Sequence, residues 1–200
     1  MTKISTSLLL LASLVLVQLP VSFDANAASA EKSDKPKRKT QLVGPSVGKK
    51  VGKAFELYAL EESDVQGALN LLLEINAKKE FDKAYVNRFI AVMYATLGNQ
   101  EKNAIKYLKL AVAPDILNEA DHGEALKLLA DLQMQTQDYK GALVNYKAWM
   151  DFTGKSDGDT WTKIANAHYS LKQLDKIIVP ADNAIAAYGD KHNQNPYILK

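Results

Sequence analysis

The chain has 200 residues, of which 47% are hydrophobic, with a formal net charge of +2 and no cysteine. This apolar share is enough for a substantial core, which excludes a disordered chain. The lack of cysteine excludes disulfides, a thiolate nucleophile and a lipid-anchor cysteine, so packing alone must hold the fold.

Residues 1–27 have the pattern of a secretory signal peptide. Lys3 precedes a long apolar run that begins at Leu8, and two overlapping groups of small residues end at Ala27 and Ala30. An uncleaved membrane anchor is the alternative, but the run is shorter than the roughly 20 apolar residues that a spanning helix needs. We expect cleavage after Ala27 or Ala30. Export without disulfides favours a bacterial periplasm over the eukaryotic secretory route.

Residues 28–48 are expected to form a flexible basic arm, because Pro and Gly interrupt them and nothing repeats at a helical or strand period. Eight Lys or Arg stand against two acidic residues over positions 31–53. The run at 35–39 could attract an anionic membrane surface, an acidic partner or the cell wall, or could be a solvated tether. From Ala54 onward there are sixteen basic and twenty acidic side chains, which argues against nucleic-acid binding.

Residues 49–190 carry apolar side chains at spacings of three and four, separated by short polar turns, which predicts an all-α domain of paired helices. A small residue opens the second helix of each pair at Ala68, Ala104 and Ala142, and Ile177 takes that place in the last pair. The spacings are 36, 38 and 35 residues. This period lies in the range of helical solenoid repeats.

The motifs within each unit keep one register. The first helices contain Trp161-x-x-Ile164-Ala165-x-x-His168, Ile90-Ala91-x-x-Tyr94 and Leu129-Ala130, and the second helices contain Ala68-x-x-x-Leu72, Ala104-x-x-x-Leu108 and Ala142-x-x-x-Tyr146. On these residues the chain resembles a tetratricopeptide (TPR) array over about residues 49–188. The resemblance implies a right-handed α-solenoid of about four helix-turn-helix repeats, in which small residues let paired helices approach closely.

The first and last units depart from the repeat pattern, and the second has one extra residue before Ala104. The first unit lacks a clear motif near Phe55, and Ile177 stands where the other units have alanine. End repeats are often atypical. Residues 191–200 read as the start of a further, truncated repeat.

A narrower resemblance rests on the leader, the basic arm, Gly48-Lys49-Lys50-Val51 and the stretch from Tyr146 to Gly154. These features are similar to those of periplasmic TPR proteins associated with TonB energy-transduction systems. That resemblance implies a TonB/ExbB/ExbD-type complex as partner and an accessory role in TonB-dependent transport.

Sequence motifs for catalysis or metal binding lack the structural context that each of them requires. Gly44-Pro45-Ser46-Val47-Gly48 matches the nucleophile motif of hydrolases, but no strand is expected before it and the histidines lie in helical or terminal contexts. The histidines also lack metal-ligand spacing, and the acidic loop around Asp157 suits helix capping better than calcium. We predict no enzyme, no metal and no cofactor.

The face lined by the first helices is the predicted binding groove for an extended peptide or a partner helix. By register, the groove residues are Tyr85, Arg88, Glu124, Lys127, Asp131, Asn166 and Tyr169. Trp149 and Trp161 are expected in the core. The predicted function is a periplasmic protein–protein interaction module. The alternative is a structural envelope protein held on the cell wall or membrane surface by its basic arm.

Overall fold

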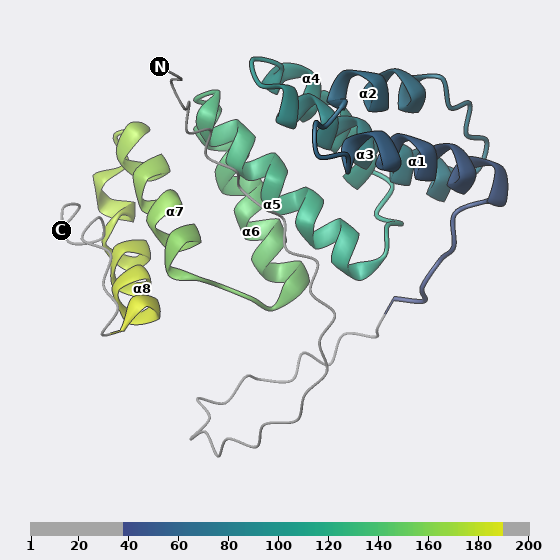
Figure 1. The fold of residues 1–200 in the computed structure, drawn as a ribbon. Helices are drawn as coiled ribbons and strands as arrows, with labels where there is room; N and C mark the ends of the chain where they lie inside the picture. The colour runs from purple at the N-terminus through teal and green to yellow at the C-terminus, as the bar shows by residue number, and fades with distance from the viewer. Residues whose placement is uncertain (1–37, 190–200) are drawn as a thin grey trace, which may run out of the picture. The chain divides into compact units, whose positions relative to one another are not determined.

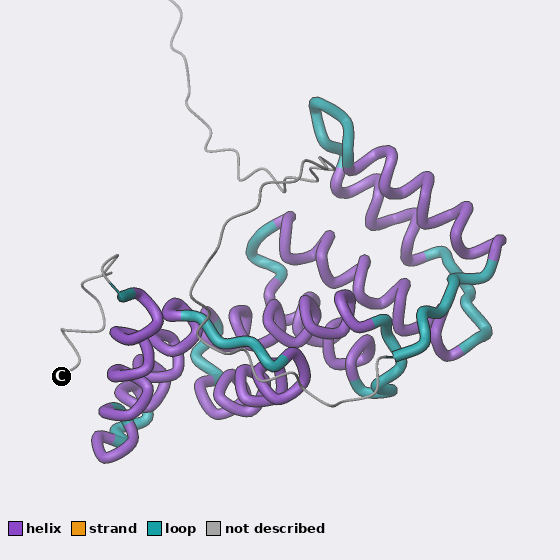
Figure 2. The backbone as a smooth tube through the Cα atoms, turned by 90° about the horizontal axis from the view of Figure 1, so that it is seen from below, coloured by secondary structure: helices purple, strands orange, loops and turns teal. Residues whose placement is uncertain are grey.

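The computed structural model describes residues 38–189, so the expected signal peptide, most of the arm and the segment 191–200 lie outside the described range. Within that range every regular element is a helix (Figures 1 and 2). The elements are α1 (Pro45–Tyr58), α2 (Val65–Leu73), α3 (Glu80–Leu97), α4 (Glu101–Val112), α5 (Glu119–Gln135), α6 (Tyr139–Thr153), α7 (Gly158–Ser170), the 3-10 helix η1 (Leu174–Lys176) and α8 (Ile178–Tyr188).

The helices pack in sequential pairs. Contacts are most extensive within α1/α2, α3/α4, α5/α6 and α7/α8, and each pair also packs on the next one. The junction between α6 and α7 is the least extensive of the three junctions between repeats. This arrangement confirms the predicted all-α solenoid of helix-turn-helix repeats, in which each unit covers the apolar face of its neighbour.

The small residues that define the repeat lie where helices touch. Ala91, Ala130 and Ala165 on the first helices and Ala104 and Ala142 on the second helices are completely buried. A larger side chain at these positions would hold the paired helices apart, because interiors are packed without spare volume. Trp149 is buried as predicted, and Trp161 is half-buried against the core formed by α5, α6 and α7.

Aspartates and tight turns set the helix boundaries. Asp64, Asp138 and Asp157 cap α2, α6 and α7, each accepting a hydrogen bond from a backbone N–H of the first turn. The acidic loop before α7 therefore contains a helix cap, as its sequence predicted. In three units the turn inside the pair contains a residue with positive φ, namely Asn99, Gln137 and Lys172.

The last unit keeps the pair but alters its second helix. Ile177 is buried, and α8 begins only after the short η1 helix, with Pro180 in its first turn. Proline is tolerated there because the first turn of a helix has no internal partner for the backbone N–H. Among residues 38–189 no helix is both long and apolar enough to cross a bilayer.

The end of the expected arm differs from the prediction. Helix α1 begins at Pro45 instead of residue 49, and residues 38–44, which we call the strap, are held on the repeats. Gln41 exchanges hydrogen bonds with Asn118 at the start of α5, and the Gly44 N–H donates to Asp82 of α3 at 3.0 Å. Local periodicity does not reveal such contacts, because their partners lie 38 and 77 residues away.

Candidate protein-binding groove

The first helices α3, α5 and α7 are linked by ion pairs along one face, which we call the groove face. On α5, Asp121, Glu124, Lys127 and Asp131 follow one another at spacings of three and four, so they lie along one side of the helix. The remaining members are Arg88 on α3, Asp157 at the cap of α7, and Asp159 and Lys163 on α7.

Arg88 joins the second repeat to the third. Its guanidinium lies 3.2 Å from Asp121, forms a short ion pair with Glu124 and lies over the Phe89 ring. The Arg88 side chain is only 14% exposed, whereas that of Glu124 is 67% exposed. The cation is therefore shielded, and a carboxylate faces solvent.

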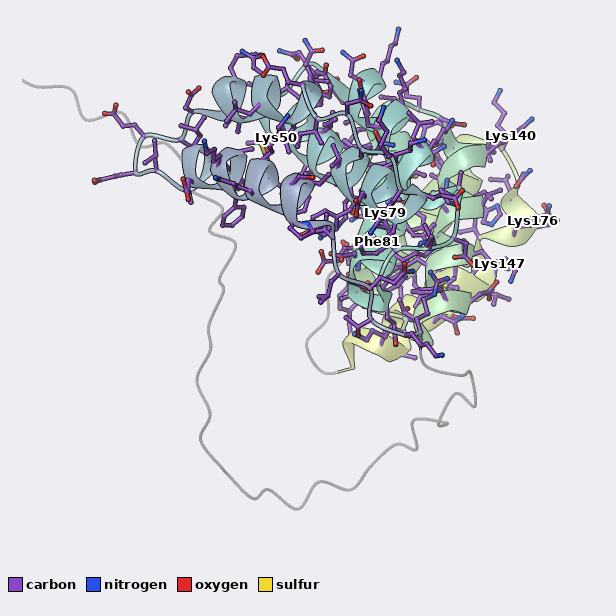
Figure 3. The ribbon with its side chains drawn as sticks, turned by 90° about the vertical axis from the view of Figure 1, so that its right-hand side faces the viewer. Lys50, Lys79, Phe81, Lys140, Lys147 and Lys176 are labelled. Atoms are coloured by element: carbon purple, nitrogen blue, oxygen red, sulfur yellow. The ribbon has the colours of Figure 1, made fainter. Side chains whose placement is uncertain are left out.

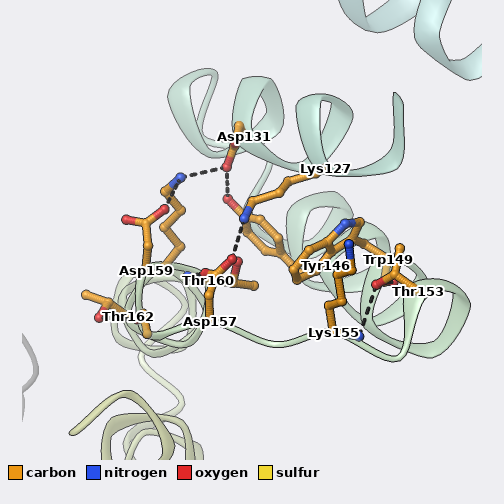
Figure 4. Close-up of polar contacts among 12 residues, drawn as sticks. Lys127, Asp131, Tyr146, Trp149, Thr153, Lys155, Asp157, Asp159, Thr160 and Thr162 are labelled. Atoms are coloured by element: carbon orange, nitrogen blue, oxygen red, sulfur yellow. Dashed lines mark hydrogen bonds and ion pairs between the residues drawn. The ribbon is translucent and has the colours of Figure 1, made fainter. Parts of the chain in front are cut away.

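Lys127 crosses the weakly packed junction between the third and fourth repeats. Its Nζ donates to Asp157 at 2.6 Å and lies 4.4 Å from the centre of the Trp149 ring (Figure 4). Burial alone would raise the pKa of Asp157, but the hydrogen bonds from Lys127 and Thr160 outweigh it and lower the pKa. Asp157 therefore caps α7 and also holds α7 against α5.

Asp131 is the second link across the same junction. It accepts hydrogen bonds from the Tyr146 hydroxyl at 2.5 Å and from Lys163 at 2.9 Å, and Lys163 also pairs with Asp159 (Figure 4). Burial and the hydrogen bond to Asp131 both raise the pKa of Tyr146. Burial would lower the pKa of Lys163, but its two carboxylate partners raise it. The network ties α5, α6 and α7 together.

Four of the seven predicted groove residues form the ion pairs of this face, and three do not. Arg88, Glu124, Lys127 and Asp131 are tied into links between repeats, so they shape the face as well as line it. Tyr85 packs between Phe81 and Phe89 and lines a cleft described below. Asn166 is half-buried and shares its side of α7 with Asp159 and Lys163. Tyr169 is exposed but points about a third of a turn away from Lys163 around α7.

Two clefts open beside these ion pairs. The first, which we call the aromatic cleft, has a volume of about 320 Å³ between α1 and α3. Its lining residues are Val43, Gly48, Val51, Gly52, Phe55, Tyr85 and Phe89. The second, which we call the tryptophan cleft, has a volume of about 430 Å³ between α5, α6 and the α6–α7 loop. Its lining includes Glu119, Glu124, Lys127, Trp149, Thr153 and Lys155.

Sequence reasoning missed part of this surface. Phe55 and Gly52 were not recognised, because α1 carries no TPR motif, although glycines four apart on an amphipathic helix were a usable signal. Asp121, Asp157 and Lys163 were not predicted as links between repeats. Trp149 was assigned to the core alone, whereas its ring also forms a wall of the tryptophan cleft.

The side chains that sequence analysis weighed for catalysis lie in separate places. Ser46 is in the first turn of α1, His168 on α7 contacts Gln173 at 2.8 Å, and His122 is buried on α5. Over the described range, no group of three or more His, Cys, Asp or Glu side chains is placed to hold a metal ion. The groove face is a charged surface with two clefts beside it.

His122 on α5 shares two contact residues with the strap. Its Nε2 lies 3.2 Å from Asp115, its ring packs on Phe152, and Arg38 of the strap pairs with the same aspartate while lying over the same phenylalanine. Burial and the neighbouring Arg38 charge outweigh the Asp115 carboxylate and lower the pKa of His122 below its ordinary value of 6.5.

We expect this histidine to make stability depend on pH. Its folded-state pKa is lowered, so its contribution is present above pH 6.5 and is lost as the pH falls below that value. The slope can reach at most about 1.4 kcal/mol per pH unit, which corresponds to one proton. Urea unfolding between pH 7.5 and 5 should show a steeper loss for the wild type than for His122→Gln. Parallel pH profiles for the two proteins would contradict the assignment.

The paired helices, the buried small residues and the open face of first helices together define a TPR-like repeat protein. Two solved structures have this fold, the nearly identical TPR-like repeats attributed to a kinesin light chain of Podosopora anserina and a single-substitution variant of them. Their TM-scores are 0.54 and 0.55 at 14% sequence identity, with 77% of this chain and 81–82% of theirs covered. At this identity the likeness establishes the fold. No family model matches the chain, and no curated protein matches it in sequence.

Proposed function

We propose that this protein is an exported, non-enzymatic scaffold that holds a partner protein on its groove face. The observation that carries the proposal is the combination of a face fixed by ion pairs between repeats with two open clefts beside it. A surface that is already ordered binds at a lower entropic cost than one that must be ordered on contact. The signal-peptide pattern and the absence of cysteine support a periplasmic location.

The narrower resemblance described above supports a more specific role. In this role the scaffold is an accessory of a TonB-dependent transport complex, and its partner belongs to a TonB/ExbB/ExbD-type assembly. The groove face has the features that such a protein contact needs, with apolar walls at Phe55 and Trp149 and a charged strip between them.

Photo-crosslinking at two exposed sites tests the groove. Glu124 on the groove face and Val144 on α6 are both exposed, and Val144 lies on the side of α6 opposite the buried Ala142 and Tyr146. Benzoylphenylalanine at position 124 should capture a defined partner in envelope preparations, because the partner covers that position. Position 144 should capture none. Equal capture at both positions, or none at position 124, would contradict groove binding.

The alternative, an envelope protein held by its basic arm, is favoured by the lysine-rich run that precedes the strap. Replacing Lys32, Lys35 and Lys37 by Gln leaves α1 and the strap contacts of Arg38 and Gln41 in place. If the arm alone provides attachment, this variant should be released from envelope fractions at low salt. If the groove provides it, release should follow groove substitutions instead.

A further inference from the structure

The aromatic cleft is an apolar site at the start of the groove face. It is lined by glycine, valine and aromatic residues, without a charged side chain among them. Phe55 forms one wall and is 53% exposed, and Tyr85 and Phe89 on α3 form the other, with ring centres 5.1 Å apart. Its volume of about 320 Å³ is at the lower end of the range for ligand pockets, about 300–1,000 Å³, which suits one or two bulky side chains.

Gly52 lines the cleft without contributing a side chain. Gly48, Gly52 and Phe55 are spaced by four and three residues, so they lie on one side of α1. A methyl group on Gly48 would crowd Val43 at 3.1 Å, whereas one on Gly52 would have no heavy atom within 4 Å. Packing within the chain therefore explains Gly48 but not Gly52. A glycine in a helix interior costs about 1 kcal/mol relative to alanine, and no contact within the described chain accounts for that cost at Gly52.

Toward α5 and α7, the accessible charge along the groove face is negative. Arg88, next to Phe89, is shielded between Asp121 and Glu124, so this group has a net charge of −1. Lys163 lies likewise between Asp131 and the more exposed Asp159. Exposed lysines such as Lys140, Lys147 and Lys176 instead point outward from α6 and η1 (Figure 3). A segment that leaves the aromatic cleft along the groove face therefore meets carboxylates.

We propose that the aromatic cleft anchors a bulky apolar side chain of a partner segment whose following residues are cationic and pair with Glu124 and Asp159. This inference rests on the proposed function, since it names the chemistry of the partner on the same groove face. The occupant is a separate polypeptide. Followed back toward the N-terminus, the strap runs from Val43 at the rim of the cleft to Arg38 beside Phe152, away from the cleft.

The test uses a fluorescein-labelled peptide of twelve residues, with one Phe followed by three Lys in a Gly–Ser background. Two matched peptides replace Phe by Ser or the three Lys by Glu. Anisotropy titrations at low ionic strength should show the wild type binding the Phe/Lys peptide about tenfold more tightly than the Ser/Lys peptide. The Glu peptide should bind more weakly than either.

Gly52→Leu fills the cleft without touching the core. This variant should lose the preference for Phe, so that it binds the Phe/Lys and Ser/Lys peptides about equally. The variant should be at least as stable as the wild type, because leucine has a higher helix propensity than glycine. Thermal unfolding checks that the variant is folded. Gly52→Ala should retain most of the preference. Glu124→Gln should weaken the binding of the Phe/Lys and Ser/Lys peptides to the same extent, and it should make binding less dependent on salt concentration.

Three results would overturn the inference: an unchanged preference for Phe in Gly52→Leu, tighter binding of the Glu peptide, or binding of Phe/Lys only after Lys32, Lys35 and Lys37 are replaced by Gln. The last result would make the chain's own arm the occupant. If no peptide binds but benzoylphenylalanine at position 124 captures a partner, the proposed function stands and this inference fails. If both experiments are negative, both proposals fail.

Discussion

Replacing Tyr146 by alanine is expected to lower the free energy of unfolding by about 3–5 kcal/mol, because the ring is completely buried between α5, α6 and α7. The substitution leaves a cavity next to Ala130 and Ile164 and removes the hydroxyl that donates to Asp131. Urea unfolding followed by circular dichroism measures the loss. Lys147→Ala, one residue further along α6 at an exposed position, should change stability by less than about 0.5 kcal/mol.

The hydroxyl and the ring of Tyr146 can be separated by Tyr146→Phe. This variant keeps the ring but removes a hydrogen bond to a charged acceptor, which is worth about 1.5–3 kcal/mol. Asp131 keeps Lys163 as a partner, so we expect a loss near the lower end of that range. A Tyr146→Ala loss below about 1 kcal/mol would mean that the ring does not hold the third and fourth repeats together.

The fold was predictable because equivalent residues pack in the same way in each repeat. The position four residues after the opening small residue is Leu72, Leu108 or Tyr146, and all three are almost completely buried. A residue that meets the same neighbours in every unit leaves a periodic trace in the sequence, so the register of the core could be inferred before any contact was known.

The candidate site was less predictable, because it depends on contacts between units. The register placed Arg88, Glu124, Lys127 and Asp131 on one face, but it could not show that each is paired across a repeat boundary. The strap is a stronger example. Arg38 was part of an apparent charge run, yet its guanidinium donates to the carbonyl oxygens of Asp115 and Leu117 at 2.9 and 3.0 Å. The aromatic cleft needed the structure as well, since α1 carries no TPR motif.

Leu108→Ala should lower the free energy of unfolding by about 2–5 kcal/mol, because Leu108 is completely buried where the second repeat meets the third. Leu110→Ala is a matched control, since it makes the same change on the same helix at a side chain that is 48% exposed. Helix propensity cancels between the two variants, so the difference in their urea midpoints reports burial alone. Equal losses would mean that α4 does not pack as described.

A repeat array is coupled only through neighbouring units, so a cavity at this boundary should also weaken the connection between its two halves. We therefore expect Leu108→Ala to lower the denaturant slope of the unfolding transition or to split the transition in two, whereas Leu110→Ala should unfold in one step like the wild type. The groove face crosses the same boundary through the ion pairs of Arg88 with Asp121 and Glu124. Leu108→Ala should consequently weaken Phe/Lys peptide binding although Leu108 lies away from the peptide, because the aromatic cleft and Glu124 lie on opposite sides of that boundary.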